Sequence, residues 1–106
     1  MKVKWMPLPK QQLRQIAKYI RNEFGKKVKD DFLQEVRDVT RLIGRSPNVG
    51  IVEPLLTNRS IMYRSCVVNH LSKIVYCIKD DHIEIVAFWD VRRDPGAIVK
   101  EIDKEF

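Results

Sequence analysis

The second half of the chain contains three cations and one aromatic residue whose spacing suits phosphate and base binding. Arg64, Lys73 and Arg92 lie in or next to three consecutive segments with the alternating apolar pattern of β-strands, and Phe88 lies in the last of these segments. Cations on a pleated surface neutralise phosphate charge, and an aromatic ring beside them can stack on a base. A solvated sheet face with ordinary charges would show the same pattern, so both interpretations stand at this point.

Short gaps between these segments determine how the strands pair. We expect strands at 60–68, 73–79 and 82–91, and the short connections force antiparallel neighbours. A two-residue turn at 80–81 and a four-residue loop at 69–72 predict these pairs: Val75 with Val86, Lys73 with Phe88, Ile74 with Ala87, Val68 with Lys73, and Arg64 with Cys77. One face is then apolar and is expected to be core; it holds Ile61, Tyr63, Val67, Ile74, Tyr76, Ile78, Ile83, Ile85, Ala87 and Trp89. The opposite face is expected to be open; it holds Met62, Arg64, Cys66, Lys73, Val75, Cys77, Lys79, His82, Glu84, Phe88, Asp90 and Arg92.

The elements that must position these strands precede them in the chain. Residues 1–5 predict a short edge strand. Apolar residues recur every three or four positions over 13–24 and again over 28–43, which predicts two amphipathic helices joined at Gly25. Residues 48–59 show no period, so we expect a loop there. The predicted fold class is therefore α+β, with an N-terminal strand, a two-helix hairpin and a three-stranded antiparallel meander, the helices being packed on one face of the sheet.

Length and composition limit the class of protein. A chain of 106 residues, 44% apolar and 32% charged, fits a single domain (residues 1–106, with 96–106 as a C-terminal tail) and is too short for a two-lobed, cofactor-dependent enzyme. Cys66 and Cys77 do not make a disulfide framework and are expected as reduced thiols on strands. The chain shows neither a signal peptide nor an apolar run of membrane-spanning length, so we expect a cytoplasmic protein with no metal, no cofactor and no membrane partner.

The formal charge of +6 is divided unevenly along the chain. Residues 1–45 contain 12 Lys and Arg against 5 Asp and Glu, whereas residues 46–106 contain 8 against 9. Most of the basic character therefore belongs to the helical hairpin, where the cations include Lys10, Arg14, Lys18, Arg21, Lys26, Lys27 and Lys29. They form either a solvated helix face or a docking surface for a polyanion or an acidic protein.

The order of these elements resembles the RelE/ParE superfamily of small toxins from bacterial type II toxin–antitoxin modules. Four short motifs support the resemblance, namely Tyr63-Arg64-Ser65, Lys73-Ile74-Val75-Tyr76, Asp80-Asp81-His82-Ile83-Glu84-Ile85 and Trp89-Asp90-Val91-Arg92-Arg93-Asp94-Pro95. Each motif is short, but their order and spacing are similar to the family's plan over nearly the whole chain, from residue 1 to residue 95.

The resemblance implies alternative activities, and whether the protein is an enzyme depends on which one holds. ParE-like toxins poison DNA gyrase without being nucleases, whereas RelE-like toxins cut mRNA on the ribosome. In a RelE-like toxin, Lys73, Arg64 and Arg92 would be the catalytic cations that stabilise attack of a ribose 2′-OH on the adjacent phosphate. The Arg-Arg-Asp-Pro ending and the long paired helices look more like the ParE branch, and Asp90 occupies a position where many members have His. A non-toxic, partner-binding relative is the third alternative.

The resemblance also implies partners. A cognate antitoxin would cover a sheet edge or the groove of the helical hairpin. The candidate binding residues are Arg93, Phe88 and Asp90 at the end of the meander, with Arg14 and Lys18 on the first helix. The helical cations would then dock to ribosomal RNA, to DNA held by gyrase or to an acidic antitoxin, or remain solvated.

Overall fold

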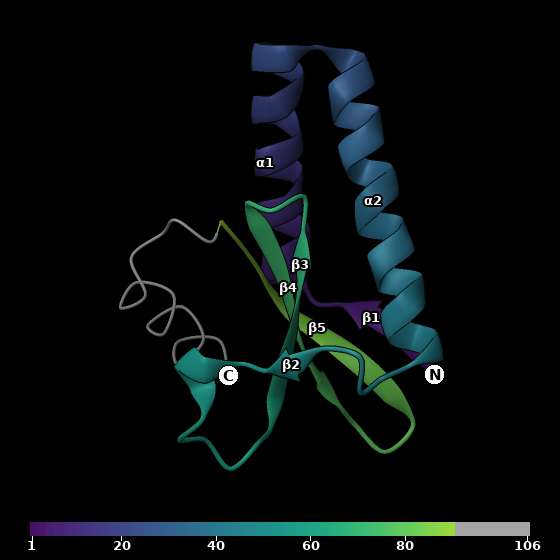
Figure 1. Cartoon of the computed structure of the whole chain (residues 1–106), viewed down its shortest axis with the longest axis vertical. Helices are drawn as coiled ribbons and strands as arrows, with labels where there is room; N and C mark the ends of the chain where they lie inside the picture. The colour runs from purple at the N-terminus through teal and green to yellow at the C-terminus, as the bar shows by residue number, and fades with distance from the viewer. Residues whose placement is uncertain (91–106) are drawn as a thin grey trace.

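A helical hairpin stands on one face of a five-stranded sheet in the computed structural model, which describes residues 1–90 (Figure 1). The elements in chain order are β1 (Lys2–Trp5), α1 (Pro7–Phe24), α2 (Lys26–Arg45), β2 (Ile51–Val52), the short 3₁₀ helix η1 (Pro54–Leu56), β3 (Tyr63–Val68), β4 (Ser72–Ile78) and β5 (His82–Asp90). The strand order is β1-β5-β4-β3-β2, with β1 parallel to β5 and the other neighbours antiparallel. The predicted α+β class and element order are confirmed, and β2 adds a short strand where a loop was expected.

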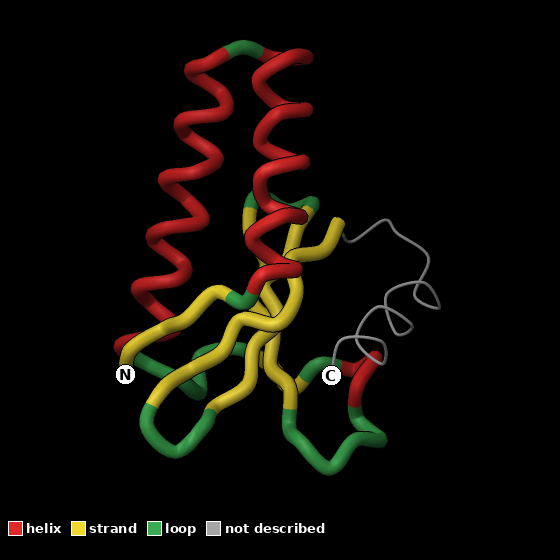
Figure 2. The backbone as a smooth tube through the Cα atoms, turned by 180° about the vertical axis from the view of Figure 1, so that it is seen from behind, coloured by secondary structure: helices red, strands yellow, loops and turns green. Residues whose placement is uncertain are grey.

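The joint between the two helices depends on Gly25. Its φ of 95° is a conformation that residues with a Cβ rarely adopt, and its N–H donates to the carbonyl of Arg21 at 3.0 Å to close the end of α1. One residue thus separates two long helices, which lie side by side and extend beyond the sheet (Figure 2). Ile20, Phe32 and Val36 are buried where the hairpin packs on the sheet.

The loop between β3 and β4 is one residue shorter than predicted. Val68 pairs with Ser72, so three residues rather than four connect the strands. Asn69 and His70 both have positive φ, 54° and 62°, which tightens the connection. The predicted pairs Val68 with Lys73 and Arg64 with Cys77 are therefore wrong, and Arg64 pairs with Tyr76 instead. A one-residue slip exchanges the two faces of a strand, so Arg64 and Cys66 belong to the helix side and Tyr63 to the opposite side.

A β-bulge in β5 changes which side chains face the helices. Next to the turn the strands pair as predicted, but beyond a register shift Val75 pairs with Ala87 rather than with Val86. The extra residue turns Phe88 towards the helices and Trp89 away from them. The predicted pairs Lys73 with Phe88 and Ile74 with Ala87 are wrong as well, as is the assignment of Ala87 and Trp89 to the helix-covered face.

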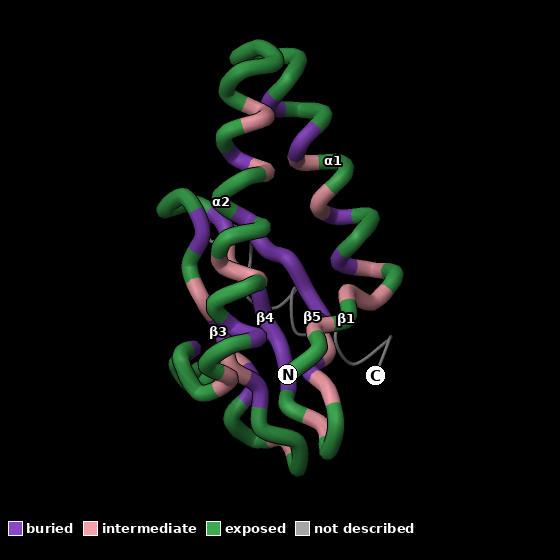
Figure 3. The backbone as a smooth tube through the Cα atoms, turned by 90° about the vertical axis from the view of Figure 1, so that its right-hand side faces the viewer, coloured by how far each residue is buried: buried purple, intermediate pink, exposed green. Residues whose placement is uncertain are grey.

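Both faces of the sheet are covered, although one was predicted to be open. The helix side buries Ile20, Phe32, Val36, Ile43, Val68, Ile74, Tyr76, Ile83, Ile85 and Phe88. The other side buries a smaller cluster, Leu56, Tyr63, Val75, Cys77, Val86, Ala87 and Trp89, in which Leu56 of η1 takes part. Figure 3 shows β4 and β5 buried along most of their length, whereas the tip of the hairpin is exposed. Cys66 is half-buried and Cys77 buried, both as free thiols on strands as expected.

Candidate functional site

Lys73 forms an ion pair with a buried carboxylate. Its Nζ donates to both oxygens of Glu53 at 2.8 Å, and the side chain of Glu53 is 0% exposed while that of Lys73 is 19% exposed. The same Nζ lies 5.5 Å from the centroid of the Trp89 ring. The charge of Lys73 is thus compensated inside the protein, and the adjacent carboxylate would repel a phosphate.

Glu53 is the residue of this cluster that the sequence did not single out. It precedes η1, its backbone N–H donates to the carbonyl of Tyr63 at 2.8 Å, and its Oε1 accepts from the N–H of Leu55 at 3.4 Å. An acidic residue directly before Pro54 is a typical helix-capping signal and could have been recognised. Its pairing with Lys73, twenty residues later, depends on how the segment before β3 folds over the sheet.

Arg64 points to the other face of the sheet and forms a hydrogen bond with the loop after α2. Its Nη1 donates to the carbonyl of Gly50 at 2.8 Å, and the N–H of Gly50 donates to the hydroxyl oxygen of Tyr76 at 2.9 Å. A Cβ on Gly50 would lie 2.7 Å from that oxygen, so only glycine fits here. The structure therefore does not bring Arg64 and Lys73 together on one surface, because the three-residue loop places them on opposite faces.

Phe88 is not the exposed aromatic that the predicted register required. Only 1% of it is exposed, and its ring lies 6.1 Å from the rings of both Trp5 and Phe32. Its N–H donates to Oε1 of Gln12 at 3.0 Å, which ties the strand beyond the bulge to α1. Phe88 is therefore a core residue, and stacking on a base is excluded by its burial.

The other predicted site residues lie on the helix side of the sheet, on α1 or outside the described residues. Asp90 is the last residue of β5 and is half-exposed. Arg14 and Lys18 are exposed on α1, as expected for a solvated face or a docking surface. Arg92 and Arg93, like the expected tail at 96–106, fall outside the residues that the structure describes.

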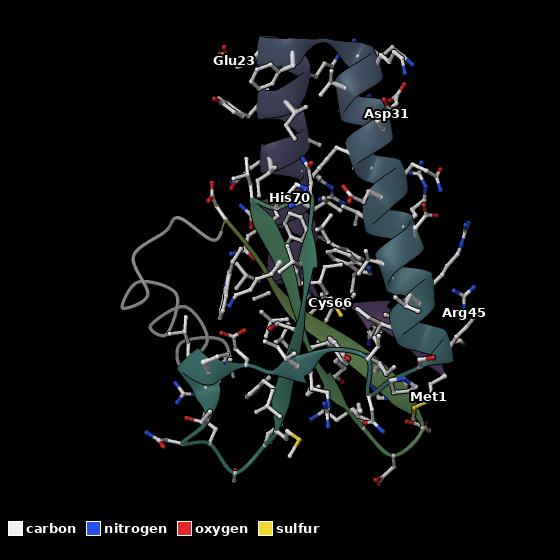
Figure 4. All side chains as sticks on the ribbon, in the orientation of Figure 1. Met1, Glu23, Asp31, Arg45, Cys66 and His70 are labelled. Atoms are coloured by element: carbon white, nitrogen blue, oxygen red, sulfur yellow. The ribbon has the colours of Figure 1, made fainter. Side chains whose placement is uncertain are left out.

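An apolar groove lies between the outer half of the helical hairpin and the β3–β4 loop. Its volume is about 550 Å³, and its lining includes Tyr19, Phe24, Val28 and Leu71, whose exposed fractions are 58%, 63%, 46% and 46%. In Figure 4 His70, in the β3–β4 loop, lies below the tip of the hairpin, where Glu23 is seen. Exposed apolar side chains gathered in one groove are typical of a protein-binding site.

A second polar cluster surrounds His82 at the start of β5. Its Nδ1 lies 2.6 Å from Oδ1 of Asp81 and its Nε2 lies 2.9 Å from Oε2 of Glu84. The hydrogen bond to Asp81, followed by that to Glu84, raises the pKa of His82, since both carboxylates favour the charged imidazolium. Both ring nitrogens thus contact carboxylates of the turn and of β5, which fixes the side chain at the start of this strand.

Residues 1–90 contain neither a metal-binding cluster nor a membrane-spanning helix. No group of three His, Cys, Asp or Glu side chains in that range is arranged to hold a metal ion. Over the same range, no helix combines the length and apolar character needed to cross a membrane.

The chain is similar to known toxins in sequence pattern and in fold. Residues 3–95 match the family described as ParE toxin of type II toxin-antitoxin system, parDE. Among solved structures, the chromosomal ParDE TA system from P. aeruginosa aligns with a TM-score of 0.72 at 16% identity, covering 87% of this chain and 97% of that one. The YoeB dimer from Staphylococcus aureus aligns with a TM-score of 0.56 at 21% identity, covering 82% and 92%. No curated protein sequence matches this chain.

Proposed function

This chain belongs to the ParE toxin family of type II toxin–antitoxin systems, and from that premise we propose that it inhibits bacterial growth by binding DNA gyrase in the cytoplasm rather than by cutting RNA. Binding is favoured over RNA cleavage by the contacts and positions of two of the predicted cleavage cations, those that lie within residues 1–90. Lys73 is paired with the buried Glu53, and Arg64 lies on the opposite face of the sheet. Stabilising a cleavage transition state requires donors that converge on one phosphate, and these two do not converge.

The fold itself does not distinguish the two activities. The chain aligns with both a ParDE structure and a YoeB structure, each below 25% identity, so these likenesses concern the architecture alone. The position of the sheet cations therefore supports binding over cleavage, and the alternative nuclease is tested by the same experiment.

Purified full-length toxin is added to gyrase and relaxed plasmid, and in parallel to a translating extract with a defined mRNA. We expect loss of supercoiling and accumulation of linear plasmid after denaturation of the enzyme, with intact mRNA. Preincubation with the antitoxin encoded beside the toxin should abolish the effect. Codon-positioned mRNA cuts together with normal supercoiling would overturn the proposal, and an inactive protein in both assays would indicate the non-toxic alternative.

The antitoxin is proposed to occupy the apolar groove of the hairpin. Val28 lines this groove at 46% exposure, and Val49, in the loop after α2 and outside the groove, is similarly exposed at 43%. Burying the exposed half of this side chain contributes about 1 kcal/mol, and burying an unpaired carboxylate in an apolar groove costs more, so we expect Val28→Glu to weaken antitoxin binding by at least about tenfold. Val49→Glu is the matched control, and titration calorimetry measures both. Equal affinities for the two variants would place the antitoxin elsewhere.

A further inference from the structure

We propose that α1 provides a contact surface for the phosphate backbone of duplex DNA. The surface consists of Lys10, Arg14, Lys18 and Arg21, all exposed and spaced by four, four and three residues along one 18-residue helix. At 3.6 residues per turn, these four positions fall within an arc of about 80° and extend over about 16 Å of helix. They form one narrow band of positive charge, here called the α1 stripe.

The α1 stripe has no counter-charge among the described residues. Within residues 1–90, none of its four side chains makes a hydrogen bond or an ion pair. The only acidic residue of α1 is Glu23, which lies at the tip of the hairpin (Figure 4) and on the opposite side of the helix from the stripe. The charge of the stripe is therefore available to a partner.

The neighbouring helix shows the contrasting arrangement. At the start of α2, Lys26 pairs with Asp30 at 2.7 Å and Lys27 pairs with Asp31 at 3.2 Å. The hydrogen bond from Lys26 also lowers the pKa of Asp30, as expected for a carboxylate beside a cation. Cations with local counter-charges are typical of a solvated helix face. The α1 stripe lacks such counter-charges, so a solvated face explains α2 better than α1.

The side chains around the stripe favour a polyanion over a protein partner. The exposed neighbours on one flank are the neutral amides Gln11, Gln15 and Asn22. Protein–protein interfaces are depleted of Lys and enriched in aromatic residues at their centre, and the stripe shows the reverse. Lys, Arg, Asn and Gln are the side chains that contact phosphate oxygens in DNA complexes. The exposed apolar residues Tyr19, Phe24 and Val28 line the groove proposed for the antitoxin, which adjoins this flank at Gln15.

The expected affinity follows from counterion release. Each phosphate contact contributes a slope of about −0.9 to the plot of log K against log salt, so four contacts contribute about −3.6. Raising the salt concentration fourfold would then weaken binding by about 150-fold. Such a surface alone gives sequence-independent binding with a Kd of about 10⁻⁴ to 10⁻⁶ M at physiological salt. Placed on a gyrase-bound toxin, it would touch the DNA that gyrase holds, and this last step rests on the proposed function.

The test uses full-length protein and a fluorescent mixed-sequence duplex of about 20 base pairs, with binding followed by anisotropy from about 50 to 200 mM KCl. Arg14→Gln/Lys18→Gln removes two cations of the stripe with a good helix former at both positions. Lys26→Gln/Lys27→Gln removes the same charge from the paired face of α2 and is the control. We expect the slope of the stripe variant to be less steep than that of the wild type by about 1.8. Fourfold more salt then weakens the binding due to the remaining stripe contacts by only about 12-fold. The control should keep the wild-type slope.

Equal slopes for the two double variants would overturn the inference, because the effect would then be one of net charge. Unchanged DNA binding combined with weaker binding of the stripe variant to antitoxin or to DNA-free gyrase would also overturn it, in favour of an acidic protein partner. The duplex assay contains no gyrase, so it does not depend on the proposed target. A toxin that binds DNA with the expected slope but leaves supercoiling intact would refute the gyrase proposal alone.

Discussion

Replacing Lys73 with Met distinguishes a structural role for this lysine from a catalytic one. Methionine keeps an unbranched apolar stem beside Trp89 but removes the ammonium that lies 2.8 Å from both oxygens of Glu53. The carboxylate, 0% exposed, would remain buried without its counter-charge. Breaking a buried ion pair from one side costs about 3–5 kcal/mol. Since the Lys73 side chain is 19% exposed and water can reach that edge, we expect about 3 kcal/mol.

The double variant Lys73→Met/Glu53→Gln should recover most of this loss. A neutral glutamine removes the buried charge and can still accept the N–H of Leu55, which Glu53 bonds at 3.4 Å. Replacing both members of a buried pair is often close to neutral, so we expect the double variant within about 1 kcal/mol of the wild type. Lys79→Met, directly after the end of β4, is the control and should change stability by less than about 0.5 kcal/mol.

Urea unfolding followed by circular dichroism measures the four proteins, and growth after induction measures toxicity. A structural Lys73 predicts that toxicity returns together with stability in the double variant. A stable but non-toxic double variant would mean that the ammonium itself acts on the target, which would favour the nuclease. A Lys73→Met variant as stable as Lys79→Met would refute the stabilising role of the pair.

Three further predictions concern the fold around the site. The hydroxyl of Tyr76 bonds two backbone groups of the loop between α2 and β2, at 2.6 and 2.9 Å, and Tyr76→Phe leaves both without this partner. We expect the free energy of unfolding, measured with urea, to fall by about 1–3 kcal/mol. An unchanged midpoint would mean that the loop does not depend on these bonds. The pKa of His82 is raised by Asp81 and Glu84, so its contribution to stability is full below the unfolded pKa near 6.5 and is lost as pH rises through the folded value. His82→Gln should therefore be more destabilising at about pH 5.5 than at about pH 8.5, and an equal difference from wild type at both pH values would contradict this. Phe88→Ala should cost about 3–5 kcal/mol by opening the core, whereas an exposed stacking residue would tolerate the change, so a thermal or urea midpoint decides between them.

The elements and their order were predictable because they depend on local patterns. The apolar period of each helix, the conformational freedom of Gly25 and the short turn at 80–81 are all properties of neighbouring residues. The reduced cysteines and the location of most basic charge on the hairpin could also be predicted from the sequence. The stripe of Arg14 and Lys18 is likewise visible there, although only the structure shows which cations have counter-charges.

The faces of the sheet were not predictable, since alternation along a strand is reversed by a single residue. One bulge in β5 buried Phe88 and moved Trp89 beside Lys73, and one residue fewer in the β3–β4 loop moved Arg64 to the helix side. Such choices depend on packing between distant segments, here Phe88 against Phe32 and Trp5. Local patterns along the chain account for the elements that this toxin-family chain forms and for where its charge lies. The engagement of Lys73 and Arg64 within the protein depends on long-range packing, which buries Glu53 and creates the bulge.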